Sequence, residues 1–225
     1  MAEWLSTHFP PALIELFVDS LGETLVMVGL SGLAGAVLGI PLGVLLRLTD
    51  RGGVMENAAF NRTVGALVNA VRSTPFIILL VAIIPLTRLL TGSSIGTAAA
   101  VVPLTVAAAP FIARLVEASL REVDAGLIEA AQAMGATHTQ IVFKVLLPEA
   151  VPGIVAGLTI TLVSLTGYSA MAGAIGGGGL GDLGIRYGYQ RFMPEVMAAV
   201  VLVLIVFVQA VQSAGDWLVR RLSHR

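Results

Sequence analysis

Few side chains in this sequence could carry out a reaction, and their spacing argues against an enzyme. The chain has no cysteine, which excludes thiolate metal sites and cysteine nucleophiles. Its three histidines, His8, His138 and His224, lie far apart and form no HExxH pair. Ser164 and Ser169 lack the His/Asp arrangement of a hydrolase. The sequence therefore predicts no catalytic centre, no metal site and no cofactor.

Two further patterns test whether the chain binds nucleotides. Lys144 is the single lysine, and no glycine-rich loop precedes it, so the phosphate-binding GxxxxGK[ST] loop is absent. The glycines at 176–179, with Gly181, formally match GxGxxG, but they follow an apolar segment of membrane-span length instead of a strand. These glycines instead predict a tight, irregular turn at the outer surface. Any ATP-driven step is expected to take place on a separate subunit.

The composition points to lipid as the surroundings of most of the chain. Of the 225 residues 56% are hydrophobic and only 12% are charged, with a mean hydropathy of +0.92 and a net charge of −1. Soluble domains carry about 25% charged residues. A membrane-crossing helix needs about 20 apolar residues, and five segments meet this requirement: 24–46, 63–87, 95–113, 150–175 and 196–215. We predict an all-α integral membrane protein with five transmembrane helices in one transmembrane domain over 23–219.

The flanking segments and the charges suggest an orientation. Residues 1–22 mix aromatic and acidic side chains, which is typical of an interfacial segment. No Lys or Arg precedes Arg47, so the basic start of a cleavable signal peptide is missing. The positive-inside rule places the N-terminus outside and the tail 220–225 in the cytoplasm. Nine basic residues (47, 51, 62, 114, 121, 144, 220, 221, 225) would then lie inside, and three (88, 186, 191) outside.

The longest predicted cytoplasmic connection, residues 114–148, contains two short helices. The first is expected over 124–134, ended by Gly135, with an apolar face at helical spacing. The second is expected to begin at Thr137, which forms a capping box with Gln140. Pro148 is expected to stop this helix before the fourth span. The apolar face of the first helix consists of Leu127, Ala131 and Met134. Such a loop could lie on the membrane surface or fit a partner's groove.

Several features of the spans bear on assembly and on a transport path. Five helices are too few to enclose a polar passage, so we predict a homodimer. The stripe Gly35-xxx-Gly39-xxx-Gly43 could pack the two copies together, or pack helices within one subunit. Arg72, the one cation inside a span, either lines a cavity or snorkels near the cytoplasmic end. Tyr168, Ser169 and Met171 are candidates for a translocation pathway, with ordinary packing as the alternative.

The 114–148 segment resembles the EAA loop of bacterial ABC importer permeases. The matching residues are Glu129-Ala130-Ala131, Gly135 and Leu147-Pro148; Val145 stands where that family carries isoleucine. The stretches 72–88, 94–117 and 167–181 resemble the methionine-uptake branch of this family, and the likeness runs from about residue 20 to the end. It implies a type I importer permease of five spans per subunit in the bacterial inner membrane.

The resemblance also implies partners and roles. Two ABC ATPase subunits would dock on the loop, and a periplasmic or lipid-anchored substrate-binding protein would deliver L-methionine and its D-isomer. The implied ATPase-coupling residues are Leu127, Glu129, Ala130, Ala131, Met134 and Gly135.

Other functions stay open from the sequence. One is an ABC permease for another amino acid or small solute, another an ion-coupled secondary carrier, and a third a scaffold subunit of a membrane complex. No Asp or Glu lies in 24–46, 63–113 or 150–181, which argues against proton coupling. A sodium site built from backbone carbonyls would leave no such trace.

Overall fold

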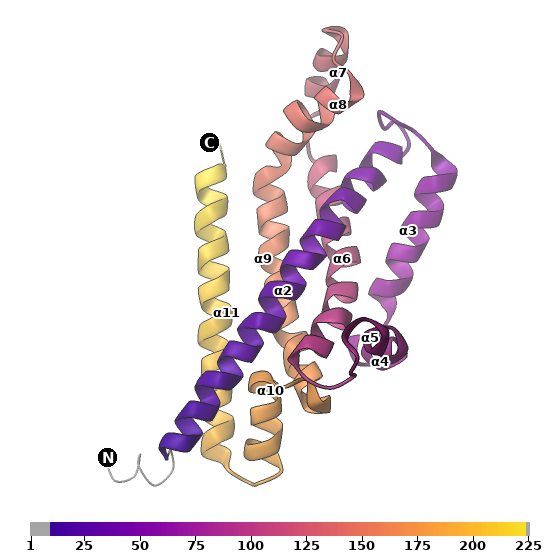
Figure 1. The fold of residues 1–225 in the computed structure, drawn as a ribbon. Coiled ribbons are helices and arrows are strands. Elements are labelled where there is room, and N and C mark those ends of the chain that lie inside the picture. The colour runs from indigo at the N-terminus through magenta and orange to yellow at the C-terminus, as the bar shows by residue number, and fades with distance from the viewer. Residues whose placement is uncertain (1–9, 224–225) are drawn as a thin grey trace. The chain divides into compact units, whose positions relative to one another are not determined.

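The structure, a computed structural model, describes residues 10–223. Helices dominate it, and the described part contains no strand. The chain runs through α2 (Pro11–Thr49), α3 (Ala58–Ser73), α4 (Phe76–Ala82), α5 (Ile84–Thr91), α6 (Thr97–Arg121), α7 (Ala125–Ala133), α8 (His138–Ile141), the π-helix η1 (Val142–Leu146), α9 (Leu147–Ala172), η2 (Gly173–Gly177), α10 (Gly179–Leu183), η3 (Gly184–Tyr189) and α11 (Pro194–Leu222) (Figure 1).

Long apolar helices confirm the predicted class. Among the described residues four helices are long and apolar enough to cross a membrane: Pro11–Thr49, Thr97–Arg121, His138–Gly177 and Pro194–Leu222. The pair α3 and α4 qualifies only as one broken span, which brings the number to five. The predicted orientation is a separate matter and stays a prediction.

The first and last helices of the described chain extend beyond the boundaries that the sequence predicts. Helix α2 begins at Pro11, a residue that suits a first helical position because its missing N–H has no helical partner there. Residues 11–22 therefore continue into the first span, while 1–9 lie outside the described residues. The interfacial role of 1–22 stays a prediction. At the other end α11 continues to Leu222, and 224–225 of the predicted tail lie outside the described part.

At the break in the second span, hydroxyl groups bond carbonyls in the last turn of α3. Pro75 has no N–H to donate to the Val71 carbonyl, which instead accepts from the Thr74 N–H at 3.2 Å. Ser73 Oγ donates to the Asn69 carbonyl at 2.8 Å, and Thr74 Oγ1 donates to the Ala70 carbonyl at 3.1 Å. The helix therefore ends without leaving these carbonyls unpaired.

Arg72 lies in the last turn of α3, at the opposite end from the loop predicted to be cytoplasmic. At 1.5 Å per residue it is about 21 Å along the helix from Ala58. The predicted orientation and a position of Arg72 near the cytoplasmic end therefore do not agree with each other, and both stay predictions. The guanidinium carbon instead lies 5.8 Å from the centroid of the Phe111 ring, within cation–π range.

The chain divides into two compact units, and each of the long helices α2, α6, α9 and α11 has one part in each unit. The first consists of residues 1–32, 75–105 and 162–211, and the second of 33–74, 106–161 and 212–225. A core cluster of the first unit combines side chains from α2, α10 and α11. Its buried members are Leu13, Leu180, Leu183, Val196 and Val200.

Within the first unit the glycine run reverses the chain, which confirms the expected irregular turn. Gly176 and Gly178 have φ values of +93° and +80°, in the left-handed region that favours glycine. The new direction is held from α2: Glu23 Oε2 accepts from the Gly179 N–H at 2.6 Å, and Thr24 Oγ1 accepts from the Leu180 N–H at 2.9 Å. Two consecutive side chains of α2 thus cap the start of α10.

Within the second unit the glycine stripe of α2 packs against α6 of the same chain. A Cβ built on Gly39 would lie 2.5 Å from the Ala109 carbonyl oxygen, and one on Gly43 would lie 2.5 Å from that of Ala113. Glycine is needed here because the helix backbones approach too closely for any side chain. The suggestion that this stripe joins two copies of the chain is wrong, since α6 already covers it.

Pro148 does not stop a helix as predicted. Helix continues from His138 to Gly177, and the π-helix η1 precedes the proline. In η1 the Leu147 N–H donates to the Val142 carbonyl five residues back. This wider turn absorbs the irregularity that a missing N–H would otherwise cause. The capped helix and the fourth span are therefore joined in one continuous helical segment.

Candidate functional site

Helix α7 is built from local signals in the order predicted. Asp124 is its N-cap, and the carboxylate oxygen Oδ1 accepts from the Gly126 N–H at 2.6 Å. The helix ends at Ala133 with Met134 as its C-cap, and Gly135 follows with φ +78°. The Ala136 N–H then donates back to the Ala131 carbonyl at 3.0 Å, so the chain turns sharply away. The predicted glycine terminus is confirmed.

The surface of α7 is largely uncovered. Ala131 is buried, whereas Leu127 is 46% and Met134 82% exposed. Glu129 and Ala130 are exposed as well. The predicted apolar face is therefore divided: its alanine packs inward, and its two large members remain free. Large apolar side chains left exposed at the end of a unit are typical of a surface that meets a partner.

The short helix α8 follows α7 and begins at a capped N-terminus. Thr137 and Gln140 form the predicted capping box: the Thr137 N–H donates to Gln140 Oε1 at 2.8 Å, and the Gln140 N–H donates to Thr137 Oγ1 at 3.3 Å. Ile141, on the same helix, is fully buried. Helix α7 also packs against η1, and α7 and α8 lie together at one end of the second unit (Figure 1).

A cavity of about 180 Å³ separates α7 from the end of α2 and the loop that follows. Glu129 and Gln132 of α7 line it on one side, and Arg47 with Gly52 and Gly53 on the other. Arg47 and Glu129 carry opposite charges, and Arg47 Nε is buried without a hydrogen-bond partner. The side chain of Arg47 is thus a charged neighbour of α7 that the sequence did not reveal.

The three pathway candidates in α9 do not share one environment. The Tyr168 ring stacks on the Phe76 ring, with centroids 4.7 Å apart and planes 9° apart. Met171, one turn later, is 49% exposed. Ser169 is buried, and its hydroxyl donates to the Thr166 carbonyl at 2.8 Å within the same helix. Tyr168 and Met171, three residues apart, lie on the same side of α9. The Ser169 hydroxyl instead donates its hydrogen within the helix and is buried.

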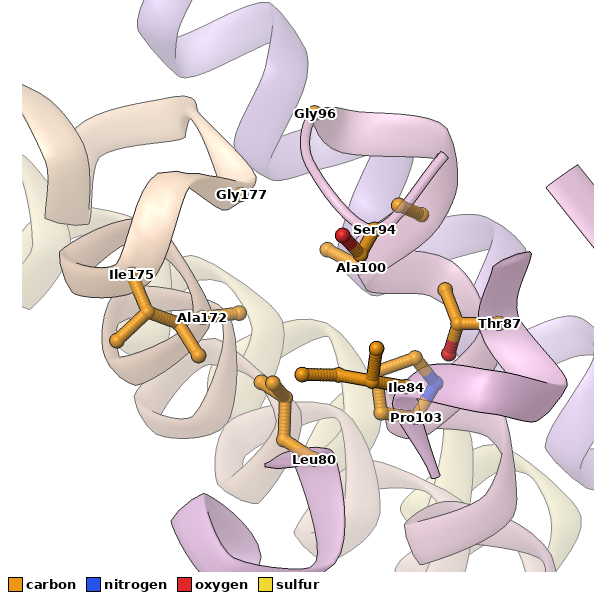
Figure 2. A pocket seen from close by; sticks show the side chains of 11 residues that line it. Leu80, Ile84, Thr87, Ser94, Gly96, Ala100, Pro103, Ala172, Ile175 and Gly177 are labelled. Atoms are coloured by element: carbon orange, nitrogen blue, oxygen red, sulfur yellow. The ribbon is translucent and has the colours of Figure 1, made fainter. Parts of the chain in front are cut away.

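A second cavity lies in the first unit, where α4, α5, α6 and the end of α9 meet (Figure 2). Leu80, Ile84 and Ile175 point into it, and the hydroxyl of Thr87 on its wall donates to the Ile83 carbonyl at 3.2 Å. The cavity measures about 20 Å³, room for one water molecule. It is too small to hold an amino acid.

Comparison with known proteins gives consistent matches over nearly the whole chain. A family model described as "Binding-protein-dependent transport system inner membrane component" matches residues 39–224. The probable D-methionine transport system permease protein MetI of Vibrio cholerae serotype O1 is 54% identical over 225 residues, which is 100% of this chain and 98% of the relative. The D-methionine transport system permease protein MetI of Escherichia coli K12 is 60% identical over 158 residues, covering 70% and 73%.

Solved structures give the same result. A chain from inward facing conformations of the MetNI methionine ABC transporter matches with a TM-score of 0.94 at 54% identity, covering 96% of this chain and 100% of that one. A chain of an amino acid ABC transporter with histidines matches with a TM-score of 0.77 at 21% identity, which shows a shared fold.

Proposed function

The chain belongs to the family of binding-protein-dependent transport system inner membrane components, and from this membership we propose that it is the permease subunit of an ATP-binding cassette importer for methionine. The relatives that match over most of the chain are named for D-methionine transport. The proposed substrates are therefore L-methionine and its D-isomer.

The observation that carries the mechanism is the exposed helix α7. It is fixed at both ends by caps, yet Leu127 and Met134 are uncovered. The sequence contains no phosphate-binding GxxxxGK[ST] loop. We therefore assign ATP hydrolysis to a separate ATPase subunit whose groove receives α7. A short helix with exposed apolar anchors fits such a groove.

The proposed importer contains two copies of this chain, two ATPase subunits and a substrate-binding protein on the outer face. Closure of the ATPase subunits would move both α7 helices and so alternate the access of a path between the two copies. Tyr168 and Met171 are the side chains we assign to that path. The stacked pair of Tyr168 and Phe76 and the flexible thioether of Met171 suit an apolar amino-acid side chain.

Reconstitution tests the proposal. The chain is purified in mild detergent, its co-purifying subunits are identified, and uptake of labelled methionine is measured in proteoliposomes that contain the substrate-binding protein. We expect uptake only with the ATPase subunits and ATP. Full uptake by this chain alone would instead establish an ion-coupled carrier.

The docking surface is tested separately by the double substitution Leu127→Ala and Met134→Ala. Truncation of a central apolar anchor costs more than about 1 kcal/mol of binding free energy, so the ATPase subunits should dissociate during purification. Leu89→Ala is the matched control, because Leu89 is 80% exposed on α5 of the first unit. Equal retention of ATPase subunits by both variants would contradict docking on α7.

A further inference from the structure

Glu117, near the end of α6, is a charged residue that the proposed mechanism has not yet used. It is 2% exposed, although it is a glutamate on a helix of membrane-span length. Two arginines of the same helix bracket its carboxylate: Arg114 Nη1 lies 2.6 Å from Oε2, and Arg121 Nη2 lies 2.6 Å from Oε1. The buried charge is thus paired on both oxygens, which is the condition for keeping it ionised inside a protein.

Both arginines also reach beyond α6. Arg114 Nη2 donates to the Gly65 carbonyl of α3 at 2.9 Å, and Arg121 Nη2 lies 2.9 Å from Asp50 Oδ2 in the loop after α2. Gly65 permits this approach, because a Cβ there would come within 3.1 Å of Arg114 Nη2. The carboxylate of Glu117 therefore holds two side chains that connect α6 with α3 and with the α2–α3 loop.

The end of α2 is tied into the same assembly. Asn61 of α3 donates through Nδ2 to the Leu46 carbonyl at 2.7 Å and to Thr49 Oγ1 at 3.2 Å. Three helices of the second unit thus meet through polar contacts at one end. Charge-assisted hydrogen bonds of arginine hold a defined geometry, since the guanidinium is planar and its donors are fixed.

This assembly lies close to α7 along the chain. Only Glu122, Val123 and Asp124 separate Arg121 from the first residue of α7, and Val123 is buried while Asp124 caps the helix. The connection has little freedom to absorb a displacement. A movement of α7 must therefore act on the end of α6, and through the two arginines on α3 and the α2–α3 loop.

We propose that Glu117, with Arg114 and Arg121, is the joint that passes the displacement of α7 to α2 and α3. The inference rests on the proposed function, in which an ATPase moves α7. Glu117 is a positioning residue: it touches no substrate and acts through the arginines. Removing its charge deprives both guanidinium groups of the carboxylate that positions them, so their contacts with α3 and the loop lose a fixed geometry.

The test compares Glu117→Gln with Glu122→Gln in the complete importer. Glu122 is an exposed carboxylate five residues further along the chain, and its substitution removes the same charge. For Glu117→Gln we expect methionine imported per ATP hydrolysed to fall about fivefold, a change typical of single substitutions in a coupling network. ATP hydrolysis itself should continue. Glu122→Gln should keep the wild-type ratio, and Glu117→Asp should lie between the two.

A second readout does not depend on the substrate. The chain has no cysteine, so Thr63→Cys adds one thiol to it, at an exposed site on α3. Labelling of this subunit by a maleimide is followed on a gel with and without trapped ATP. We expect ATP to change the labelling rate in the wild-type background and this change to be lost with Glu117→Gln. If methionine is not imported but the ATP-dependent change behaves in this way, the proposed substrate fails and the joint holds.

An unaltered ratio together with an unaltered labelling response in an assembled Glu117→Gln complex would overturn the joint. A purely structural role would lower hydrolysis, transport and thermal stability in parallel and keep the ratio, which also contradicts the inference. Should Glu117→Gln fail to assemble, Asp50→Asn cuts only the bond between the loop and Arg121. Its ratio should fall in the same direction by a smaller factor, and a wild-type ratio would refute the proposal.

Discussion

Replacing Gly135 perturbs the residue after the C-cap of α7, in the segment that we propose to dock on the ATPase subunit. Gly135 has φ +78°, and a Cβ built on it meets nothing within 4 Å. The subunit therefore has space for a side chain at this position. The backbone conformation is the obstacle, because L-residues enter the left-handed region only at a cost.

The size of the effect should follow that backbone cost. An ordinary L-residue in the left-handed region costs about 1 to 2 kcal/mol, and a β-branched residue costs more. Asparagine adopts this region readily because its side chain bonds locally. A cost of about 1 to 2 kcal/mol shifts an equilibrium by a factor of about 5 to 30. The native end of α7 should therefore be retained in Gly135→Asn, weakened in Gly135→Ala and largely lost in Gly135→Val.

Methionine imported per ATP hydrolysed, in proteoliposomes that contain the complete importer, measures the result. We expect this ratio to decrease in the order wild type, Asn, Ala, Val. The opposite order of Ala and Asn would refute the backbone explanation, because alanine is the smaller residue and asparagine the less strained one. It would mean that the ATPase subunit occupies the space around Gly135 and rejects any larger side chain. A wild-type ratio for Gly135→Val would contradict the docking of this segment.

Three more substitutions test separate parts of the structure. Gly39→Val should destabilise the protein by at least about 1 to 3 kcal/mol through overpacking, measured as thermal unfolding in detergent. Gly29→Val is the control, because a Cβ at Gly29 meets no atom within 4 Å, and its unfolding temperature should stay close to wild type. Tyr168→Ala removes the stack on Phe76, worth about 0.5 to 1.5 kcal/mol, and should change the KM for methionine; unchanged kinetics and substrate preference would remove Tyr168 from the path. Thr137→Ala deletes a capping bond worth about 1 kcal/mol and should increase hydrogen exchange in α8, so equal exchange in both proteins would argue against the cap.

The resemblance found in the sequence is confirmed at the level of the family, and the comparisons support the methionine branch. The roles of single residues remain predictions. The six predicted coupling residues lie on a capped helix or directly after it, and most of them are exposed: Leu127, Glu129, Ala130, Ala131, Met134 and Gly135. Among the pathway candidates, the structure separates Ser169 from Tyr168 and Met171, since its hydroxyl is bonded within α9.

The sequence by itself determined the features that depend on nearby residues or on composition. The apolar segments predict the spans, because lipid requires about 20 apolar residues per crossing. Gly135 and the pair Thr137 and Gln140 predict helix ends, because caps involve residues only a few positions apart. Each of these signals is read over a few residues or along one segment, so folding partners elsewhere in the chain do not alter it.

Only the tertiary structure decided which distant segments meet. The stripe that includes Gly39 indicates a close helix contact, but its period is the same whether the partner is α6 or a second subunit. The three- and four-residue spacing of Arg114, Glu117 and Arg121 is visible in the sequence, whereas their bonds to Asp50 and Gly65 join residues far apart along the chain. The continuous helix through Pro148 likewise depends on a π-turn that no local rule for proline predicts. Contacts between distant segments depend on packing in three dimensions, which the order of residues along one helix does not contain.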